Sequence, residues 1–210
     1  MPTKRKITLS KDKVRNKDVS HLKEYFTYRG DEFYFDQPAG ECEFRLYAEL
    51  SDLVNNTTIL DIGTRYGGSA LALSHNPNNQ VITYDVVEWE SHSKLRKDNI
   101  DMRIGNFMED SSIDYNDVDI IMIDVDPHDG LQEPPMIQFL EEKGWVGILL
   151  LDDISTEGTR GSEGQIDPWP AIREMWEQLP YEKYDVTDIG HFSGTGLINF
   201  GNKFDFKLVG

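Results

Sequence analysis

The sequence predicts an α/β fold with a mostly parallel, seven-stranded sheet that carries helices on both faces and ends in an antiparallel strand pair. Apolar runs of strand length alternate with amphipathic stretches of helix length, which is the pattern of parallel strands joined by helical crossovers. Two runs, Val118–Asp124 and Trp145–Asp153, are apolar almost throughout, as expected of strands buried on both faces. The last two expected strands, Tyr184–Asp188 and Thr195–Phe200, follow one another closely enough to pair in antiparallel.

One stretch, residues 58–87, is predicted to organise the chain as a strand, a glycine turn, a helix and a second strand. The expected elements of this stretch are the strands Ile59–Ile62 and Val81–Tyr84 and the helix Ala70–Ser74. The first strand contains Asp61, and a second acid, Asp85, directly follows the second strand. Asp85 lies about 20 residues beyond the turn, the spacing at which an acid at a strand end binds a ribose hydroxyl.

The glycine turn points to a cofactor other than a dinucleotide. From Gly63 the spacing is G-x-x-x-G-G, which differs from the G-x-G-x-x-G of dinucleotide-binding folds, and the turn lacks the lysine of a P-loop. Gly63 and Gly67 allow the backbone to approach a ligand closely. Asp61, just before the first glycine, suits a ligand with a cationic group, such as S-adenosylmethionine (SAM). A βαβ unit with a purely structural role is the plainer alternative.

The remaining expected elements are the helices His21–Tyr28, Glu41–Val54, Glu88–Asn99, Pro135–Glu142 and Trp169–Leu179 and the strand Asp101–Ile104. Helix Glu41–Val54 has the clearest amphipathic pattern, with one apolar stripe made of Leu46, Tyr47, Leu50, Leu53 and Val54. Thr156–Pro168 is a polar loop, and loops of this length are usually functional or disordered. We expect two regions, an N-terminal arm with an aromatic cap segment over residues 1–40 and the α/β domain over residues 41–210.

Composition limits the class of protein. A chain of 210 residues suits one domain with a full hydrophobic core. It has no apolar run of membrane-spanning length and no expected signal peptide. The single cysteine, Cys42, excludes an internal disulfide framework and favours a reducing, cytoplasmic compartment.

The charge of the chain is strongly negative and unevenly distributed. The net charge is −17, from 38 acidic and 21 basic residues. Met1–Lys17 holds seven of the bases and one acid, which leaves 14 bases against 37 acids in the rest of the chain. Because such a body repels phosphate backbones, a nucleic-acid substrate is not expected. We expect the basic segment to be a solvated, partly disordered arm.

Several predicted strands end on carboxylates, namely Asp61, Asp85, Asp124, Asp152 and Asp153. The carboxyl ends of parallel strands lie on one edge of the sheet, where ligands bind, so these acids should line one crevice. Clustered carboxylates repel one another unless a cation lies between them. Oxygen ligands suit Mg²⁺ or Mn²⁺, and the sequence has no Cys/His set with zinc spacing.

The motifs resemble those of class I SAM-dependent methyltransferases. DIGTRYGGSALAL, from Asp61, is similar to the first motif of that family, and ITYDVV is similar to the second. IDVDPHDG and LLLDDIS resemble the two metal-binding motifs of Mg²⁺-dependent O-methyltransferases of the catechol and caffeoyl-CoA type. They resemble still more the macrolide-sugar O-methyltransferases and cephalosporin-hydroxylase-like proteins, as does GHFSGTGLINF. The resemblance spans Glu41 to about Gly201 and implies a Rossmann-like class I methyltransferase fold.

The resemblance also implies which residues form the site. The metal ligands would be Asp124, Asp152 and Asp153, and the cofactor would contact Asp61, Gly63, Thr64, Arg65, Gly67, Ser69, Asp85, Val86, Asn106, Phe107 and Asp124. A bound cation would lower the pKa of the acceptor hydroxyl and hold it in line with the methyl group. Pro127 stands where catechol-type enzymes have a lysine, so the candidate catalytic bases are His128, His191 and the metal-bound Asp124.

The leading prediction is therefore a SAM- and divalent-metal-dependent O-methyltransferase that acts on a small polyol, most plausibly a sugar or glycan. A catechol or other phenol is the nearest alternative acceptor. A nicotinamide-dependent oxidoreductase would use Asp85 for its ribose, but the glycine spacing and the Asp152–Asp153 pair argue against it. A non-catalytic binding module would not need the intact set of carboxylates. A small-molecule or glycan acceptor is the expected partner, and the oligomeric state, monomer or homo-oligomer, is left open.

Overall fold

The computed structural model describes residues 4–25, 38–126, 130–155 and 170–210. Its main sheet has seven strands in the order β4-β3-β2-β5-β6-β8-β7. These strands are β2 (Thr58–Ile62), β3 (Gln80–Asp85), β4 (Ile100–Ile104), β5 (Val118–Ile123), β6 (Gly147–Asp152), β7 (Glu182–Asp185) and β8 (Thr195–Phe200). Strand β8 runs antiparallel to both of its neighbours, and the remaining pairs are parallel. The predicted sheet and its C-terminal antiparallel pair are confirmed.

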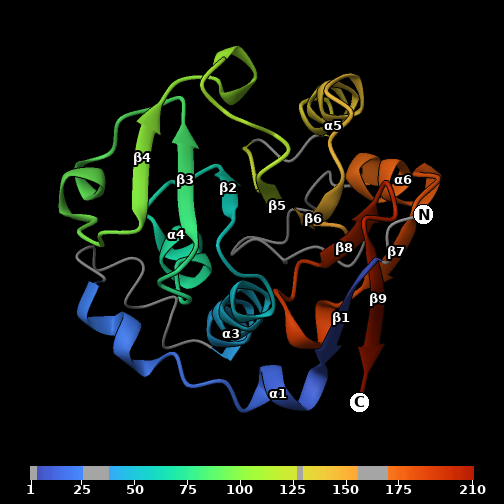
Figure 1. Ribbon diagram of the computed structural model, residues 1–210, viewed down its shortest axis with the longest axis horizontal. Coiled ribbons are helices and arrows are strands. Elements are labelled where there is room, and N and C mark those ends of the chain that lie inside the picture. The colour runs from blue at the N-terminus through green and yellow to red at the C-terminus, as the bar shows by residue number, and fades with distance from the viewer. Residues whose placement is uncertain (1–3, 26–37, 127–129, 156–169) are drawn as a thin grey trace, which may run out of the picture.

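Side chains alternate along each strand, so the sheet carries a hydrophobic core on each face. In β2, Ile59 faces one core and Leu60 faces the other. The main helices are α3 (Pro38–Leu53), α4 (Gly68–Leu73), α5 (Glu133–Glu142) and α6 (Pro170–Gln178). The first two contribute side chains to the core of Ile59, and the last two contribute to the core of Leu60. Figure 1 shows α3 on one side of the sheet and α5 and α6 on the other, which confirms the predicted layers.

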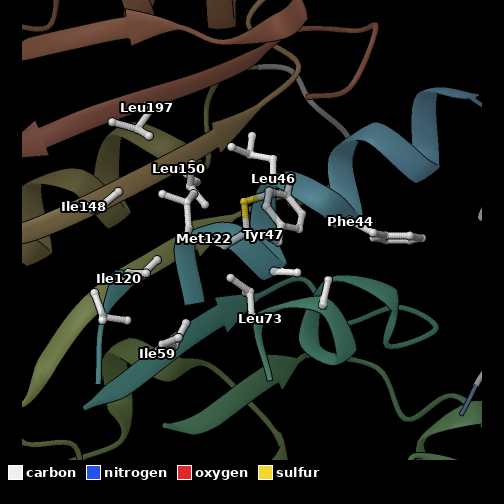
Figure 2. Close-up of a cluster of buried hydrophobic side chains, with 14 of the residues drawn as sticks. Phe44, Leu46, Tyr47, Ile59, Leu73, Ile120, Met122, Ile148, Leu150 and Leu197 are labelled. Carbon is white, nitrogen blue, oxygen red and sulfur yellow. The ribbon is translucent and has the colours of Figure 1, made fainter. Parts of the chain in front are cut away.

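Helix α3 follows its predicted apolar stripe. Leu46, Tyr47, Leu50 and Val54 are buried, and Leu53 is partly buried against the same core. Figure 2 shows Tyr47 in one cluster with Met122 of β5 and Leu150 of β6. Each of these two strand residues lies two positions before a strand-end acid. The packing therefore places the first turns of α3 close to the carboxyl ends of β5 and β6.

Two predicted helices are reduced to single 3₁₀ segments. The segment expected at His21–Tyr28 is η1 (Ser20–Tyr25), with residues 26–28 outside the described part of the chain. The segment expected at Glu88–Asn99 is η2 (Glu90–Lys94). Neither stretch has the regular apolar spacing that lets an α-helix bury one face. Two further 3₁₀ segments are η3 (Phe107–Glu109) and η4 (Thr187–Ile189).

The prediction of a solvated N-terminal arm is wrong. Arg5–Ser10 forms strand β1, which pairs in parallel with β9 (Phe204–Val209) in a separate two-stranded sheet, and α1 (Lys11–Arg15) follows it. Ile7 and Leu9 are buried in the core that lies against α3. Strand β9 was not expected either. Each strand is short and interspersed with charged residues, so neither stands out until the two are paired.

The basic side chains of this segment are held by acids from distant parts of the chain. Lys11 and Arg15 each bind Asp188, with N–O distances of 2.8 and 3.0 Å. Lys17 binds Glu49 at 2.8 Å. Partly exposed ion pairs contribute little stability individually. They orient the segment, while burial of its apolar side chains supplies most of the stabilisation.

Some predictions fall on residues outside the described part of the chain, namely the aromatic segment over residues 26–37, His128 and the loop Thr156–Pro168. The proposed division at residue 40 stays a prediction, although Leu22 and α3 share one core. Within the residues described, no helix has both the length and the apolar character needed to cross a membrane.

We expect Leu9→Ala to lower the free energy of unfolding by about 2–5 kcal/mol, the usual cost of truncating a fully buried leucine. Thr8→Ala, at the exposed neighbouring position, is the matched control and should cost about 1 kcal/mol or less. Urea titrations of both variants measure the difference. A wild-type midpoint for Leu9→Ala would mean that β1 is not part of the core.

Candidate functional site

The glycine turn after β2 brings three strand ends into contact. Gly63 has a φ of +103°, and a Cβ at this position would lie 1.7 Å from the carbonyl oxygen of Asp124. The Gly63 N–H donates to the carbonyl of Tyr84 at 2.9 Å, and the Asp124 N–H donates to the carbonyl of Ile62 at 2.9 Å. Only glycine combines this φ with so close an approach. The turn thereby joins the carboxyl ends of β2, β3 and β5 at the point where the strand order reverses, which is where ligands bind in such sheets.

A pocket of about 210 Å³ opens at this edge of the sheet. Its lining includes seven of the predicted cofactor residues, namely Gly63, Arg65, Asp85, Val86, Asn106, Phe107 and Asp124. The other predicted cofactor residues, Asp61, Thr64, Gly67 and Ser69, do not line it. The lining also contains Trp89 and Met136, which the sequence analysis did not single out. The structure thus brings most of the predicted cofactor set together, while direct contact with a cofactor stays a prediction.

Asp85 presents a carboxylate that the backbone and one indole hold in place. Its Oδ2 accepts hydrogen bonds from the Arg65 N–H at 2.8 Å and from Trp89 Nε1 at 3.0 Å. Its Oδ1 accepts one from the Val87 N–H at 2.9 Å. A carboxylate offers about four acceptor positions, so one position on Oδ1 is left for a ligand hydroxyl.

Asp61 does not line this pocket, and its predicted contact with the cofactor stays a prediction. Its carboxylate is buried and accepts a hydrogen bond from the Thr83 hydroxyl at 2.6 Å and another from the Ser69 hydroxyl. Burial raises the pKa of Asp61 to about 6, against the opposing effect of these two hydrogen bonds. The carboxylate therefore ties β2, β3 and the start of α4 together behind the turn.

The side of the pocket formed by β4 is apolar. Phe107 is buried, with its ring edge-on to that of Phe139 at a centroid distance of 5.7 Å. Asn106 caps η3, its side-chain oxygen accepting a hydrogen bond from the Met108 N–H at 3.1 Å. Val86, which also lines the pocket, is 75% exposed. Apolar side chains beside the carboxylate of Asp85 suit a flat heterocycle attached to a ribose.

A second group of ligating side chains lies at the end of β6. One oxygen each of Asp152 and Asp153 and one ring nitrogen of His191 all lie within 4.8 Å of one another. Asp153 has a φ of +60°, a left-handed conformation that aspartate tolerates better than most residues. Two carboxylates and an imidazole make a donor set that fits a divalent cation. The predicted metal ligands Asp152 and Asp153 are thus brought together.

His191 reaches this group because the chain before β8 packs closely on the end of β6. The Ser155 N–H donates to the Ser193 carbonyl at 2.9 Å, and the Ile154 N–H donates to the Gly194 carbonyl at 3.2 Å. A Cβ on Gly194, whose φ is +109°, would lie 2.3 Å from the Ser155 nitrogen. The sequence analysis considered His191 as a base, and the structure adds it to the candidate metal ligands.

Asp124, the third predicted metal ligand, is not part of this group of three. It lies in the pocket lining beside Gly63. Its charge nevertheless raises the pKa of the buried Glu43, as does the charge of Asp152, so these acids share one neighbourhood. A role for Asp124 in metal binding stays a prediction.

Glu43 was not among the site residues predicted from the sequence. This residue of α3 is buried and accepts a hydrogen bond from the Tyr47 hydroxyl at 2.7 Å. Burial, followed by the charge of Asp152, raises the pKa of Glu43 to about 8. One signal was present in the sequence, since Glu43 and Tyr47 are four residues apart on one helix and the tyrosine belongs to the apolar stripe.

The fold is that of the class I methyltransferases, as predicted. It is similar to a methyltransferase from Podospora anserina, PaMTH1, with bound SAH (16% identity, TM-score 0.59, covering 89% of this chain and 91% of that chain). It is also similar to an O-methyltransferase from Bacillus cereus in complex with SAH (20% identity, TM-score 0.59, covering 86% and 90%). A third similar structure is the O-methyltransferase TomG from Streptomyces achromogenes, involved in tomaymycin synthesis, in complex with SAM (18% identity, TM-score 0.57, covering 88% and 91%). No protein-family model and no curated protein sequence matches the chain. At identities this low the likeness establishes the fold, and activity has to be argued from the site.

The pKa of Glu43 predicts a pH dependence of stability in protein kept metal-free with EDTA. Its pKa is about 8 in the folded state against the ordinary 4.5 of a glutamate in the unfolded chain, so between these pH values the folded state retains a proton that the unfolded chain has lost. Stability should therefore fall as pH rises through this window. Glu43→Gln, which is neutral throughout, should flatten that fall, whereas Glu41→Gln on the same helix should not. Urea unfolding from pH 5 to pH 8 measures both slopes, and equal slopes for wild type and Glu43→Gln would contradict the assignment.

Proposed function

We propose that the chain is a SAM-dependent O-methyltransferase that uses a divalent cation and methylates a hydroxyl of a small polyol, preferably a sugar or glycan. One observation carries the proposal. Asp85, whose carboxylate can accept a hydrogen bond from a ribose hydroxyl, lines a pocket beside the glycine turn. The group of Asp152, Asp153 and His191 lies at the same edge of the sheet. A transferable group and a metal-held acceptor need two such sites next to each other.

In this proposal the pocket binds SAM, which supplies the methyl group, and orients it toward the acceptor. The open acceptor position on Asp85 suits a ribose hydroxyl, and the apolar wall at Phe107 suits the adenine. The turn at Gly63 holds the backbone of Asp124 close to the end of β2, and both residues line the pocket. The carboxylate of Asp61 ties β2, β3 and α4 together next to the turn, and its contact with the cofactor stays a prediction.

The acceptor side depends on the carboxylates at the ends of β5 and β6. In this proposal Asp152, Asp153 and Asp124 would hold Mg²⁺ or Mn²⁺, and the first two already lie in one group with His191. Such a cation, when bound, lowers the pKa of a coordinated hydroxyl. His191 then has one of two roles, as a further ligand or as the base that takes the hydroxyl proton. His128, in the undescribed segment 127–129, is the other candidate base.

The net charge and the aromatic content of the chain favour one class of acceptor. The chain has 38 acids against 21 bases, so a neutral polyol is a better acceptor than an anionic one. The sequence from Tyr25 to Phe35 is rich in aromatic residues, and such rings can stack on a sugar. A catechol would use the same chemistry and is the second candidate, supported by the fold that the chain shares with O-methyltransferases.

Calorimetric titration tests the cofactor assignment first. We expect SAM and SAH to bind and NAD⁺ not to bind, because the G-x-x-x-G-G turn lacks the dinucleotide spacing. Each titration is repeated with Mg²⁺ and with EDTA. Binding of NAD⁺ alone would overturn the proposal in favour of an oxidoreductase, and binding of none of the three would favour a non-catalytic module.

Asp153→Ala separates the two halves of the site. The variant should lose methyl transfer to sugar and catechol acceptors while its SAH affinity stays within about twofold of wild type, because the residue lies outside the cofactor pocket. Radiolabelled methyl transfer and calorimetry measure the two properties. Parallel loss of both would assign Asp153 to folding or to cofactor binding. Asp114→Ala, at an exposed acid remote from the pocket lining, is the control.

A further inference from the structure

Four hydrogen bonds close a ring of side chains and backbone around the carboxylate of Asp85. The Arg65 N–H donates to Asp85 Oδ2 at 2.8 Å, and the Arg65 carbonyl lies 2.8 Å from His92 Nε2. The Trp89 N–H donates to His92 Nδ1 at 3.2 Å, and Trp89 Nε1 returns to Asp85 Oδ2 at 3.0 Å. The ring thus connects the glycine turn, the end of β3 and η2. Neither Trp89 nor His92 has a part in the function proposed above.

The ring determines the tautomer of His92. A backbone N–H can only donate, so the Nδ1 that faces Trp89 is an acceptor without a proton. The proton of the neutral imidazole is then on Nε2, where it donates to the Arg65 carbonyl. Each polar atom in this ring of hydrogen bonds therefore acts as either a donor or an acceptor. The neutral imidazole of His92 connects the backbone N–H of Trp89 to the carbonyl of Arg65.

The ring also stabilises an unfavourable backbone conformation. Arg65 has a φ of +45°, in the left-handed region that non-glycine residues rarely adopt. Such conformations persist where surrounding contacts over-determine them, and they concentrate at functional sites. Here the N–H and the carbonyl of Arg65 are both held by the ring. The aromatic side chain of Tyr66, the next residue, packs edge-on against the indole of Trp89 at a centroid distance of 5.6 Å.

The geometry points to Trp89 and His92 as positioning residues for the ribose of the cofactor. We propose that they hold Asp85 so that the remaining acceptor position on its Oδ1 faces a ribose hydroxyl. Trp89 and Asp85 both line the pocket, which places the ring at the ligand. The inference rests on the proposed function, since it presumes a ribose in this pocket. It adds selectivity, because a fixed carboxylate accepts a hydroxyl and repels a ribose phosphate.

The first test is Trp89→Phe, which keeps an aromatic ring against Tyr66 and removes the indole N–H. Calorimetric titration with SAH should show binding weakened about three- to tenfold, the effect of losing one hydrogen bond that orients a charged acceptor. The same substitution in an Asp85→Ala background should have no further effect, because Trp89 acts through Asp85. Additive losses in this double-mutant cycle would show that Trp89 contributes only to packing and would overturn the proposal.

A second series tests His92 independently of Trp89. His92→Leu should weaken SAH binding to a similar extent, and His92→Gln, which keeps one donor and one acceptor, should recover part of the loss. His75→Gln is the matched control, since His75 binds Asp52 at 2.9 Å at the other end of the sheet. Melting temperatures of all variants report folding. Failure of the wild type to bind SAH would reject the proposed function, whereas wild-type affinity in Trp89→Phe and His92→Leu would reject only this inference.

Discussion

The close approach of Gly63 to the backbone of Asp124 is the constraint on which the site depends. A Cβ at this glycine would lie 1.7 Å from the carbonyl oxygen of Asp124, so the turn and the end of β5 can meet only without a side chain there. The hydrogen bonds from Gly63 to Tyr84 and from Asp124 to Ile62 hold β2 between its two neighbours. Gly63 and Asp124 both line the pocket. The group of Asp152, Asp153 and His191 lies at the same edge because β6 runs parallel to β5.

Two carboxylates near this edge are buried for different reasons. Asp61 receives two hydroxyl hydrogen bonds and ties elements together, although burial still raises its pKa. Glu43 accepts a hydrogen bond from Tyr47, and its burial together with the charge of Asp152 raises its pKa further. Buried acids cost stability unless they are paired or coordinate a cation. A cation bound near Asp152, as proposed above, would reduce that cost and would thereby couple metal binding to folding.

Basic side chains of the N-terminal segment form ion pairs that hold this segment against the rest of the acidic chain. Lys11 and Arg15 bind Asp188, and Lys17 binds Glu49. The segment lies against α3, which carries Glu43 toward the strand ends. The basic N-terminus therefore supports the helix behind the site, and its charge is largely neutralised within the protein.

The sequence by itself determined the parts of this protein that depend on local pattern. Apolar runs identified the seven strands of the main sheet, and the spacing of Asp85 from the glycine turn identified the cofactor edge, because both signals are contained in short stretches of chain. Tertiary structure alone decided the pairing of β1 with β9, the position of Glu43, and the meeting of His191 with Asp152 and Asp153. Each of these joins residues far apart in the chain. The i, i+4 spacing of Glu43 and Tyr47 is a local signal of that one contact, but nothing local shows that Glu43 lies near Asp152 or that β1 pairs with β9. Only the packed fold shows which of these distant residues meet.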